Sequence, residues 1–164
     1  MVRPLERTKL TGAITVEVLR EHLRNAGVPV SSRDVFMNGN PTEFDLFVVR
    51  PNARPKWGII YDPRDVAAVM EIKFSGAYGQ GVTVKLQSLF NRIRSDHPHI
   101  QCVYLAIAEN PKYKHRIIFE TLGFPAFTLN WWNHSRTEIE PGDTIEAVVS
   151  CLQQALEVLP VHSD

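Results

Sequence analysis

The sequence predicts an α/β protein: a three-layer α/β/α sandwich in which helices cover both faces of a mixed central sheet. Three observations predict this fold. Helical and strand-like hydrophobic periodicities follow one another in the order α-β-β-β-α-β, with further segments of both kinds after them. One strand is apolar enough for the middle of a sheet. The 164 residues, 44% hydrophobic and 22% charged, fit one globular domain.

The first elements are a helix and a hairpin. Residues 15–26 place apolar side chains at helical spacing, and Gly27 ends that helix. Residues 28–37 and 42–50 are two predicted strands. Between them, residues 38–41 contain Asn-Gly, which is the strongest short-range hairpin signal, so the two strands are expected to pair antiparallel.

The middle of the chain supplies the predicted centre of the sheet. Residues 51–64 hold three prolines and form a long connection, with room for a short strand near its end. Residues 65–75 form the apolar central strand, and residues 76–81 form a glycine-rich loop. An amphipathic helix at 83–96 and a buried strand at 99–108 follow.

The ends of the chain lie outside this predicted core, which spans about residues 15–108. Residues 1–13 are a basic, polar lead-in. The C-terminal elaboration, 109–164, adds a helix at 112–122, a strand at 125–132 and a last amphipathic helix after Pro141, with Asp143 or Thr144 near its cap.

Charge is balanced overall but divided along the chain. The 18 basic and 18 acidic residues cancel, which argues against a polycationic nucleic-acid coat or a polybasic membrane binder. Residues 1–134 carry 17 Lys and Arg against 12 acids, whereas residues 135–164 carry one Arg against six acids. If the protein binds phosphates, the acidic C-terminal segment should lie away from the binding site.

Neither a membrane span nor a disulfide is expected. No stretch reaches the roughly 18 apolar residues that cross a bilayer, and the N-terminal residues do not resemble a signal peptide. Cys102 and Cys151 lie far apart in apolar surroundings, which is typical of reduced thiols. We therefore expect a cytoplasmic protein.

Charged residues interrupt two of the apolar strands. Glu71 and Lys73 project from one face of the predicted central strand, because residues two apart share a face. Asp45 lies within the apolar segment EFDLFVV, on the face of Glu43 and Phe47. A Glu-x-Lys pair on a strand is by itself most often a surface ion pair, but charges in otherwise apolar strands are also where functional sites are expected.

These residues resemble the signature of the PD-(D/E)XK, or restriction-endonuclease-like, nuclease superfamily. Asp45 in EFDLFVV and Glu71-Ile72-Lys73 in AAVMEIKFS carry the resemblance, and the α-β-β-β-α-β order of the core agrees with it. The proline of the family name is absent, because Phe44 precedes Asp45.

The resemblance implies hydrolysis of phosphodiester bonds with Mg²⁺, for which Mn²⁺ would substitute. Asp45, Glu71 and the backbone carbonyl of Ile72 would bind the metal, because Mg²⁺ prefers hard oxygen ligands. Lys73 would hold the attacking water and the scissile phosphate, and could help to deprotonate that water if its surroundings tune its pKa.

Two further polar residues are implied by the resemblance. An acid on the first helix is frequent in the superfamily, and Glu17 is our choice, with Glu21 as the substitute. Gln87 occupies the helix after the central strand, where a polar residue is also frequent. A solvated helix residue with no role is the alternative in each case.

The sequence therefore favours a metal-dependent endonuclease that acts on DNA in preference to RNA. A homodimer would suit it, because cutting both strands of a duplex needs two sites. A non-catalytic nucleic-acid-binding or assembly module of the same fold is the alternative. A third hypothesis is an unrelated small α/β enzyme or binding domain, in which Glu71 and Lys73 form a surface ion pair.

Overall fold

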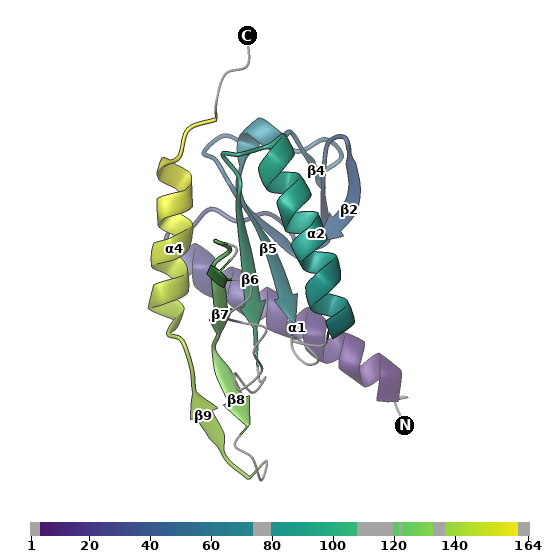
Figure 1. Ribbon diagram of the computed structural model, residues 1–164, viewed down its shortest axis with the longest axis vertical. Helices are drawn as coiled ribbons and strands as arrows, with labels where there is room; N and C mark the ends of the chain where they lie inside the picture. The colour runs from purple at the N-terminus through teal and green to yellow at the C-terminus, as the bar shows by residue number, and fades with distance from the viewer. Residues whose placement is uncertain (1–3, 74–79, 108–119, 122, 133–136, 161–164) are drawn as a thin grey trace.

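A computed structural model confirms an α/β fold around a mixed four-stranded sheet (Figure 1). It describes residues 4–73, 80–107, 120–121, 123–132 and 137–160. The sheet order is β3 (Leu46–Val49), β5 (Val66–Lys73), β6 (Gln101–Ala106) and β7 (Ala126–Thr128). β3 is antiparallel to β5, whereas β5, β6 and β7 are parallel. The strand predicted as central, β5, is buried along nearly its whole length.

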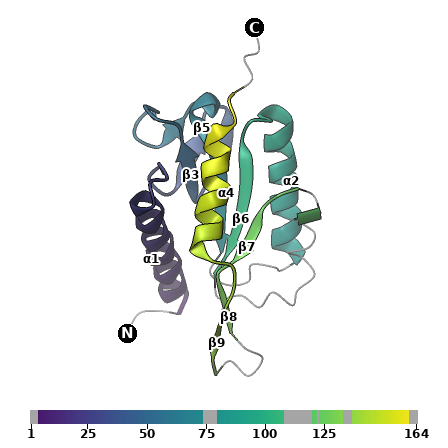
Figure 2. The same cartoon turned by 90° about the vertical axis from the view of Figure 1, so that its left-hand side faces the viewer.

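Helices cover both faces of this sheet and give the predicted three layers (Figure 2). α2 (Gln80–Asp96) packs on one face and buries Leu86, Phe90 and Ile93 in the same core as Val69 of β5. α1 (Pro4–Asn25) and α4 (Ile145–Glu157) pack on the other face. Their buried side chains form a second core with alternate residues of β5, namely Val16, Leu19, Leu23, Val148, Leu152, Ala155, Met70 and Ile72.

A smaller sheet lies beside the central one, in the order β2-β1-β4 (Figure 1). β1 (Val35–Met37) and β2 (Asn40–Phe44) form the predicted antiparallel hairpin, and Gly39 takes the left-handed conformation, φ 82°, that its turn needs. β4 (Ile60–Tyr61) pairs parallel to β1, and a short 3₁₀ helix, Pro63–Asp65, leads into β5.

The single strand predicted over residues 42–50 is wrong. Asp45 is a bend that divides it into β2 and β3, which belong to different sheets. The bend also changes the alternation of side chains, so Phe44 and Phe47 lie in the same core rather than on opposite faces. Their rings are 5.2 Å apart between centroids. Asp disfavours strand backbone, which explains why the break falls at this residue.

The lead-in predicted for residues 1–13 is also wrong, because α1 begins at Pro4. Proline suits the first turn of a helix, where it has no hydrogen bond to lose. The predicted end of α1 is confirmed: Gly27 has φ 79°, and the N–H of Val28 donates to Leu23 O at 2.9 Å.

The C-terminal elements differ in part from the prediction. The strand predicted at 125–132 is divided into β7 and β8 (Asn130–Trp132), and β8 pairs with β9 (Ile139–Pro141). Thr144 caps α4 by accepting from the Ala147 N–H at 3.2 Å. Most of the helix predicted at 112–122 and of the glycine-rich loop predicted at 76–81 lies outside the described residues, although Gln80 and Gly81 already belong to α2.

Cys102 and Cys151 are both free thiols. Within the described part of the chain, no helix combines the length and the apolar character that crossing a membrane requires.

Candidate active site

Three charged residues meet where β5 ends. Glu71 and Lys73 project from β5 toward the face that α2 covers, because they alternate with Met70 and Ile72 of the opposite core. Asp45 reaches the same place from the neighbouring edge, since Leu46, the first residue of β3, pairs with Met70. The bend at Asp45 thus places its carboxylate beside the last residues of β5.

The side chains of this trio are in contact. Lys73 Nζ lies 3.1 Å from Glu71 Oε2 and 3.8 Å from Asp45 Oδ2. The Ile72 N–H donates to Asp45 Oδ2 at 2.6 Å, which fixes the orientation of that carboxylate. The structure therefore brings together Asp45, Glu71 and Lys73.

Burial sets the electrostatics of the two carboxyl groups. Glu71 is only 7% exposed, and this burial raises its pKa to about 7, although the nearby Lys73 charge lowers it. The pKa of Asp45 is also raised, again chiefly by burial. For Lys73, burial lowers the pKa, but the carboxylates of Glu71 and Asp45 more than offset this, so its pKa is raised overall. Lys73 is therefore a cation at neutral pH.

The oxygens of this centre fit a hard divalent cation. Along β5, the backbone groups of successive residues point alternately toward β6 and toward β3. The Lys73 carbonyl accepts from the Ile107 N–H on the β6 side. The N–H and carbonyl of the adjacent Ile72 therefore point toward the other side, where Asp45 lies. The Ile72 carbonyl is thus on the same edge as the Asp45 carboxylate, beyond the last β3–β5 pair. Two carboxylates and one carbonyl, completed by waters, are a donor set that Mg²⁺ accepts.

Groups of three or more Asp, Glu, His or Cys that could hold a metal are absent from the described residues. The predicted third acid, Glu17, is held elsewhere. Its carboxylate pairs with Arg20 at 2.7 Å and lies 4.0 Å from Arg33. Arg33 also pairs with Asp34 at 3.2 Å, so Glu17 is linked to the neighbourhood of Asp45 only through other residues. The substitute, Glu21, is exposed on α1.

Gln87 lies in the second turn of α2 and is half-buried at the margin of its packed face. Among the described residues, no hydrogen bond joins Gln87 to Asp45, Glu71 or Lys73. Its proposed role beside the metal remains a prediction.

Two acids outside the predicted set of site residues, Glu43 and Asp34, act electrostatically on the centre. The charge of Glu43 raises the pKa of Glu71, and the charge of Asp34 raises that of Asp45. The Asp34 N–H also donates to Asp45 O at 3.3 Å. The Glu-x-Asp spacing could have indicated that Glu43 lies near the centre. Asp34 could not be found in this way, because it comes close to Asp45 only through the pairing of β1 with β2.

A groove of about 520 Å³ runs between β2 and α2. Its lining combines two cations, two hydroxyls and two apolar side chains: Lys85, Arg92, Thr42, Ser88, Val84 and Leu89. Arg92 Nη2 donates to Thr42 Oγ1 at 3.3 Å across it. Thr42 directly precedes Glu43 on β2, and the charge of Glu43 raises the pKa of Glu71, but Asp45, Glu71 and Lys73 are not among the residues that line the groove.

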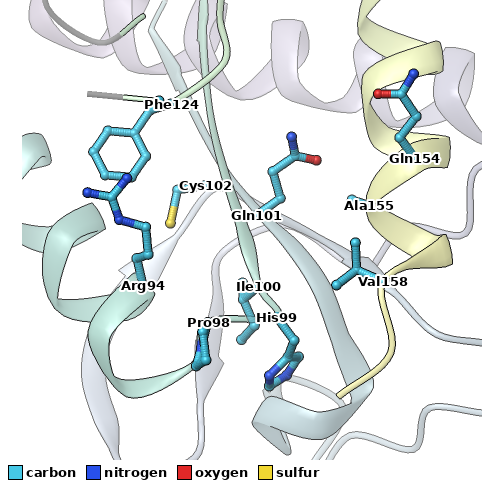
Figure 3. A pocket seen from close by; sticks show the side chains of 11 residues that line it. Arg94, Pro98, His99, Ile100, Gln101, Cys102, Phe124, Gln154, Ala155 and Val158 are labelled. Atoms are coloured by element: carbon cyan, nitrogen blue, oxygen red, sulfur yellow. The ribbon is translucent and has the colours of Figure 1, made fainter. Parts of the chain in front are cut away.

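A second cavity, of about 370 Å³, lies at the opposite end of the sheet (Figure 3). It is bordered by the start of β6, where Gln101 and Cys102 lie, and by α2 and α4. The Arg94 guanidinium stands over the Phe124 ring, 4.5 Å from its centroid. Because β5 and β6 are parallel, the start of β6 is remote from Glu71 and Lys73. This cavity adds no group to the carboxylate centre.

The centre offers oxygen ligands for a cation and a lysine to bind an anion, and α2, which covers this face of the sheet, lines a separate cationic groove with β2. Metal-dependent hydrolysis of a phosphodiester can use such groups. The likeness to the PD-(D/E)XK superfamily stays a prediction that rests on these residues. No protein-family model matches the chain, and no curated protein matches its sequence.

Proposed function

We propose that the protein is a metal-dependent nuclease that hydrolyses phosphodiester bonds, in DNA in preference to RNA. One observation carries the proposal: Asp45, Glu71 and Lys73 converge at the end of β5, with the Ile72 carbonyl on the same edge. Asp45 lies 26 and 28 positions before Glu71 and Lys73 in the sequence, and the meeting of all three side chains favours a shared site over an ion pair of Glu71 and Lys73 alone.

Each residue of the centre would have its own role in the proposed hydrolysis. Asp45, Glu71 and Ile72 hold Mg²⁺ or Mn²⁺, which when bound supplies an acidified water and neutralises phosphate charge. The Ile72 N–H keeps Asp45 oriented for this task. Lys73 remains cationic, so it binds the scissile phosphate and holds the attacking water rather than accepting the proton of that water.

The groove between β2 and α2 would bind the sugar-phosphate backbone on one side of the scissile bond. Lys85 and Arg92 supply charge, and Thr42 and Ser88 supply hydroxyl donors. The acidic α4 does not oppose this, because it packs on the other face of the sheet. Local rather than net charge is what governs phosphate binding.

A non-catalytic module of the same fold is the second candidate. It is favoured by the ion pair itself, because Lys73 already compensates Glu71 at 3.1 Å without any metal. A module of this kind would bind nucleic acid through the groove but would not cleave it.

A cleavage assay separates the two. With Mg²⁺ or Mn²⁺, we expect the wild-type protein to cut DNA, EDTA to stop the reaction, and Lys73→Ala and Glu71→Gln to slow it by about a hundredfold or more. Glu146→Gln, an exposed acid on α4, is the matched control and should cut normally. Cleavage that survives both EDTA and Lys73→Ala would refute the proposed function.

A further inference from the structure

Trp57 is an aromatic residue whose side chain buries almost no surface in the folded protein. It is 87% exposed, although tryptophan is usually well buried. Its backbone also has φ 49°, a left-handed conformation that is unfavourable for a bulky residue. The exposed indole and the left-handed backbone are each unfavourable in free energy, so a tryptophan here indicates a functional position.

The surrounding turn holds Trp57 in this position. The N–H of Lys56 donates to Ile60 O at 2.7 Å, and the N–H of Ile60 donates back to Lys56 O at 3.0 Å. Gly58 follows with φ 78°. The turn is thus closed by hydrogen bonds on both sides of the indole, which keeps the ring presented to solvent.

The turn lies at the same end of the small sheet as Asp45, with β1 between them. Gly58 O accepts from Ser32 Oγ at 3.5 Å, and Ile59 O accepts from the Phe36 N–H at 2.9 Å, so the turn lies beside the start of β1. Asp34, at that start, donates to Asp45 O. With neighbouring strands about 5 Å apart, the turn lies on the order of 10 Å from Asp45.

The positive charge of this segment indicates that Trp57 contacts a nucleic acid rather than a protein. Residues 51–60 contain two exposed cations, Arg54 and Lys56, and no acid. Aromatic rings flanked by cations are the common means of binding single-stranded nucleic acid, because every base offers a face for stacking and every nucleotide carries a phosphate.

We propose that Trp57 is a stacking platform for an unpaired base of the substrate, next to the phosphodiester held at Asp45 and Glu71. This inference rests on the proposed nuclease function and adds a substrate class to it. The protein would bind single-stranded segments, or duplex ends and bulges with an unstacked base, more tightly than continuous duplex.

Fluorescence anisotropy in EDTA, with labelled oligonucleotides of equal length, tests the inference without cleavage. Trp57→Ala should weaken binding of single-stranded DNA about tenfold, and Trp57→Tyr should stay within about threefold of wild type. For an oligonucleotide of abasic residues, wild type and Trp57→Ala should bind equally. Trp57→Gly should bind as weakly as Trp57→Ala while unfolding at equal or higher urea concentration, because glycine accepts the left-handed backbone.

The inference is overturned if wild type does not bind single-stranded DNA at low salt, or if Trp57→Ala binds it as tightly as wild type; a protein contact would then explain the exposed indole. Equal losses on normal and abasic oligonucleotides would also overturn it. The proposed function fails in a different way, when binding persists but neither metal nor Lys73 affects cleavage.

Discussion

Asp45, Glu71 and Lys73 form a charged centre that is costly to bury without compensation. Glu71 is nearly buried, and Lys73 is 35% exposed at the side chain, so the pair is shielded from much of the solvent. An ion pair of this kind contributes little net stability, but removing one member leaves a charge that the interior cannot solvate. The free energy of unfolding of the metal-free protein should therefore depend on the balance of charge among these three residues.

Lys73→Ala should lower the free energy of unfolding of the metal-free protein by roughly 1–3 kcal/mol at pH 8, less than for a fully buried pair. In the double variant Lys73→Ala with Glu71→Gln, most of the lost free energy of unfolding should be recovered, because a neutral amide needs no neighbouring cation. Since burial raises the pKa of Glu71 to about 7, the loss should shrink as the pH falls and Glu71 takes up a proton. Urea unfolding in EDTA of wild type, both single variants and the double variant measures this; strictly additive losses would contradict it.

Cys102 should be unreactive in the native protein. It is 3% exposed, and burial raises its pKa to about 12, so at pH 8 it is almost entirely the thiol. Because the folded pKa lies above the ordinary value of 9, deprotonation at higher pH also opposes folding. In Cys151→Ser protein, a disulfide reagent at pH 8 should label Cys102 only as fast as the protein unfolds. Labelling within seconds in buffer would contradict the burial.

At the scale of elements, the periodic segments could be predicted and the break at Asp45 could not. α2, β5 and β6 carry enough apolar residues at a regular spacing to be recognised one by one. The segment EFDLFVV reads as one strand because its apolar residues are continuous on both sides of Asp45. Its division depends on β2 pairing with β1 while β3 pairs with β5, which is a tertiary effect.

The same reasoning applies to the candidate site. Asp45, Glu71 and Lys73 could be found because charges in apolar strands break a local pattern. Asp34 and the exposed Trp57 could not, because an acid before a strand and an aromatic in a proline-containing loop break no pattern. Their positions follow from the pairing of β1 with β2 and β4.

Two glycines, Gly12 inside α1 and Gly27 just after its end, should respond in opposite ways to the same substitution. Neither Gly12 nor Gly27 has any atom within 4 Å of an added Cβ, so only the backbone differs. Gly12→Ala should raise the free energy of unfolding by about 0.5–1 kcal/mol, since alanine favours a helix interior. Gly27→Ala should lower it by about 1 kcal/mol, because φ is 79° there. Urea unfolding measures both, and a change of the same sign in both variants would contradict the assigned end of α1.

For the molecule as a whole, the fold separates only part of the charge that the sequence divides, because Asp143 accepts from the N–H of Thr128, which lies level with Lys73 two strands away in the sheet. α4, from the acidic C-terminal segment, packs with α1 on one face of the sheet (Figure 2). Glu71 projects toward the other face, which α2 covers, and residues of α2 line the cationic groove. Zero net charge is thus compatible with a local site for phosphates, whose binding depends on the nearby field.

Salt dependence of binding should locate that site. Replacing Lys85 and Arg92 together by Ala should reduce the slope of log affinity for duplex DNA against log salt by about two, because each contact with a phosphate releases about one counterion. Arg24→Ala, an exposed cation of α1, is the control and should leave the slope unchanged. Anisotropy titrations in EDTA over a range of salt concentrations give the slopes; an unchanged slope in the double variant would exclude the groove as the backbone site.

Anomalous diffraction from a crystal soaked in Mn²⁺ at pH 8 would show whether Asp45, Glu71 and the Ile72 carbonyl form a metal site. We predict one strong anomalous peak within about 2.0–2.3 Å of oxygens of both carboxylates, with Lys73 displaced from at least one of them. The same soak of Glu71→Gln should show no peak there. A wild-type crystal in which saturating Mn²⁺ leaves both carboxylates bound to Lys73, with no metal between them, would rule out a metal site at the end of β5.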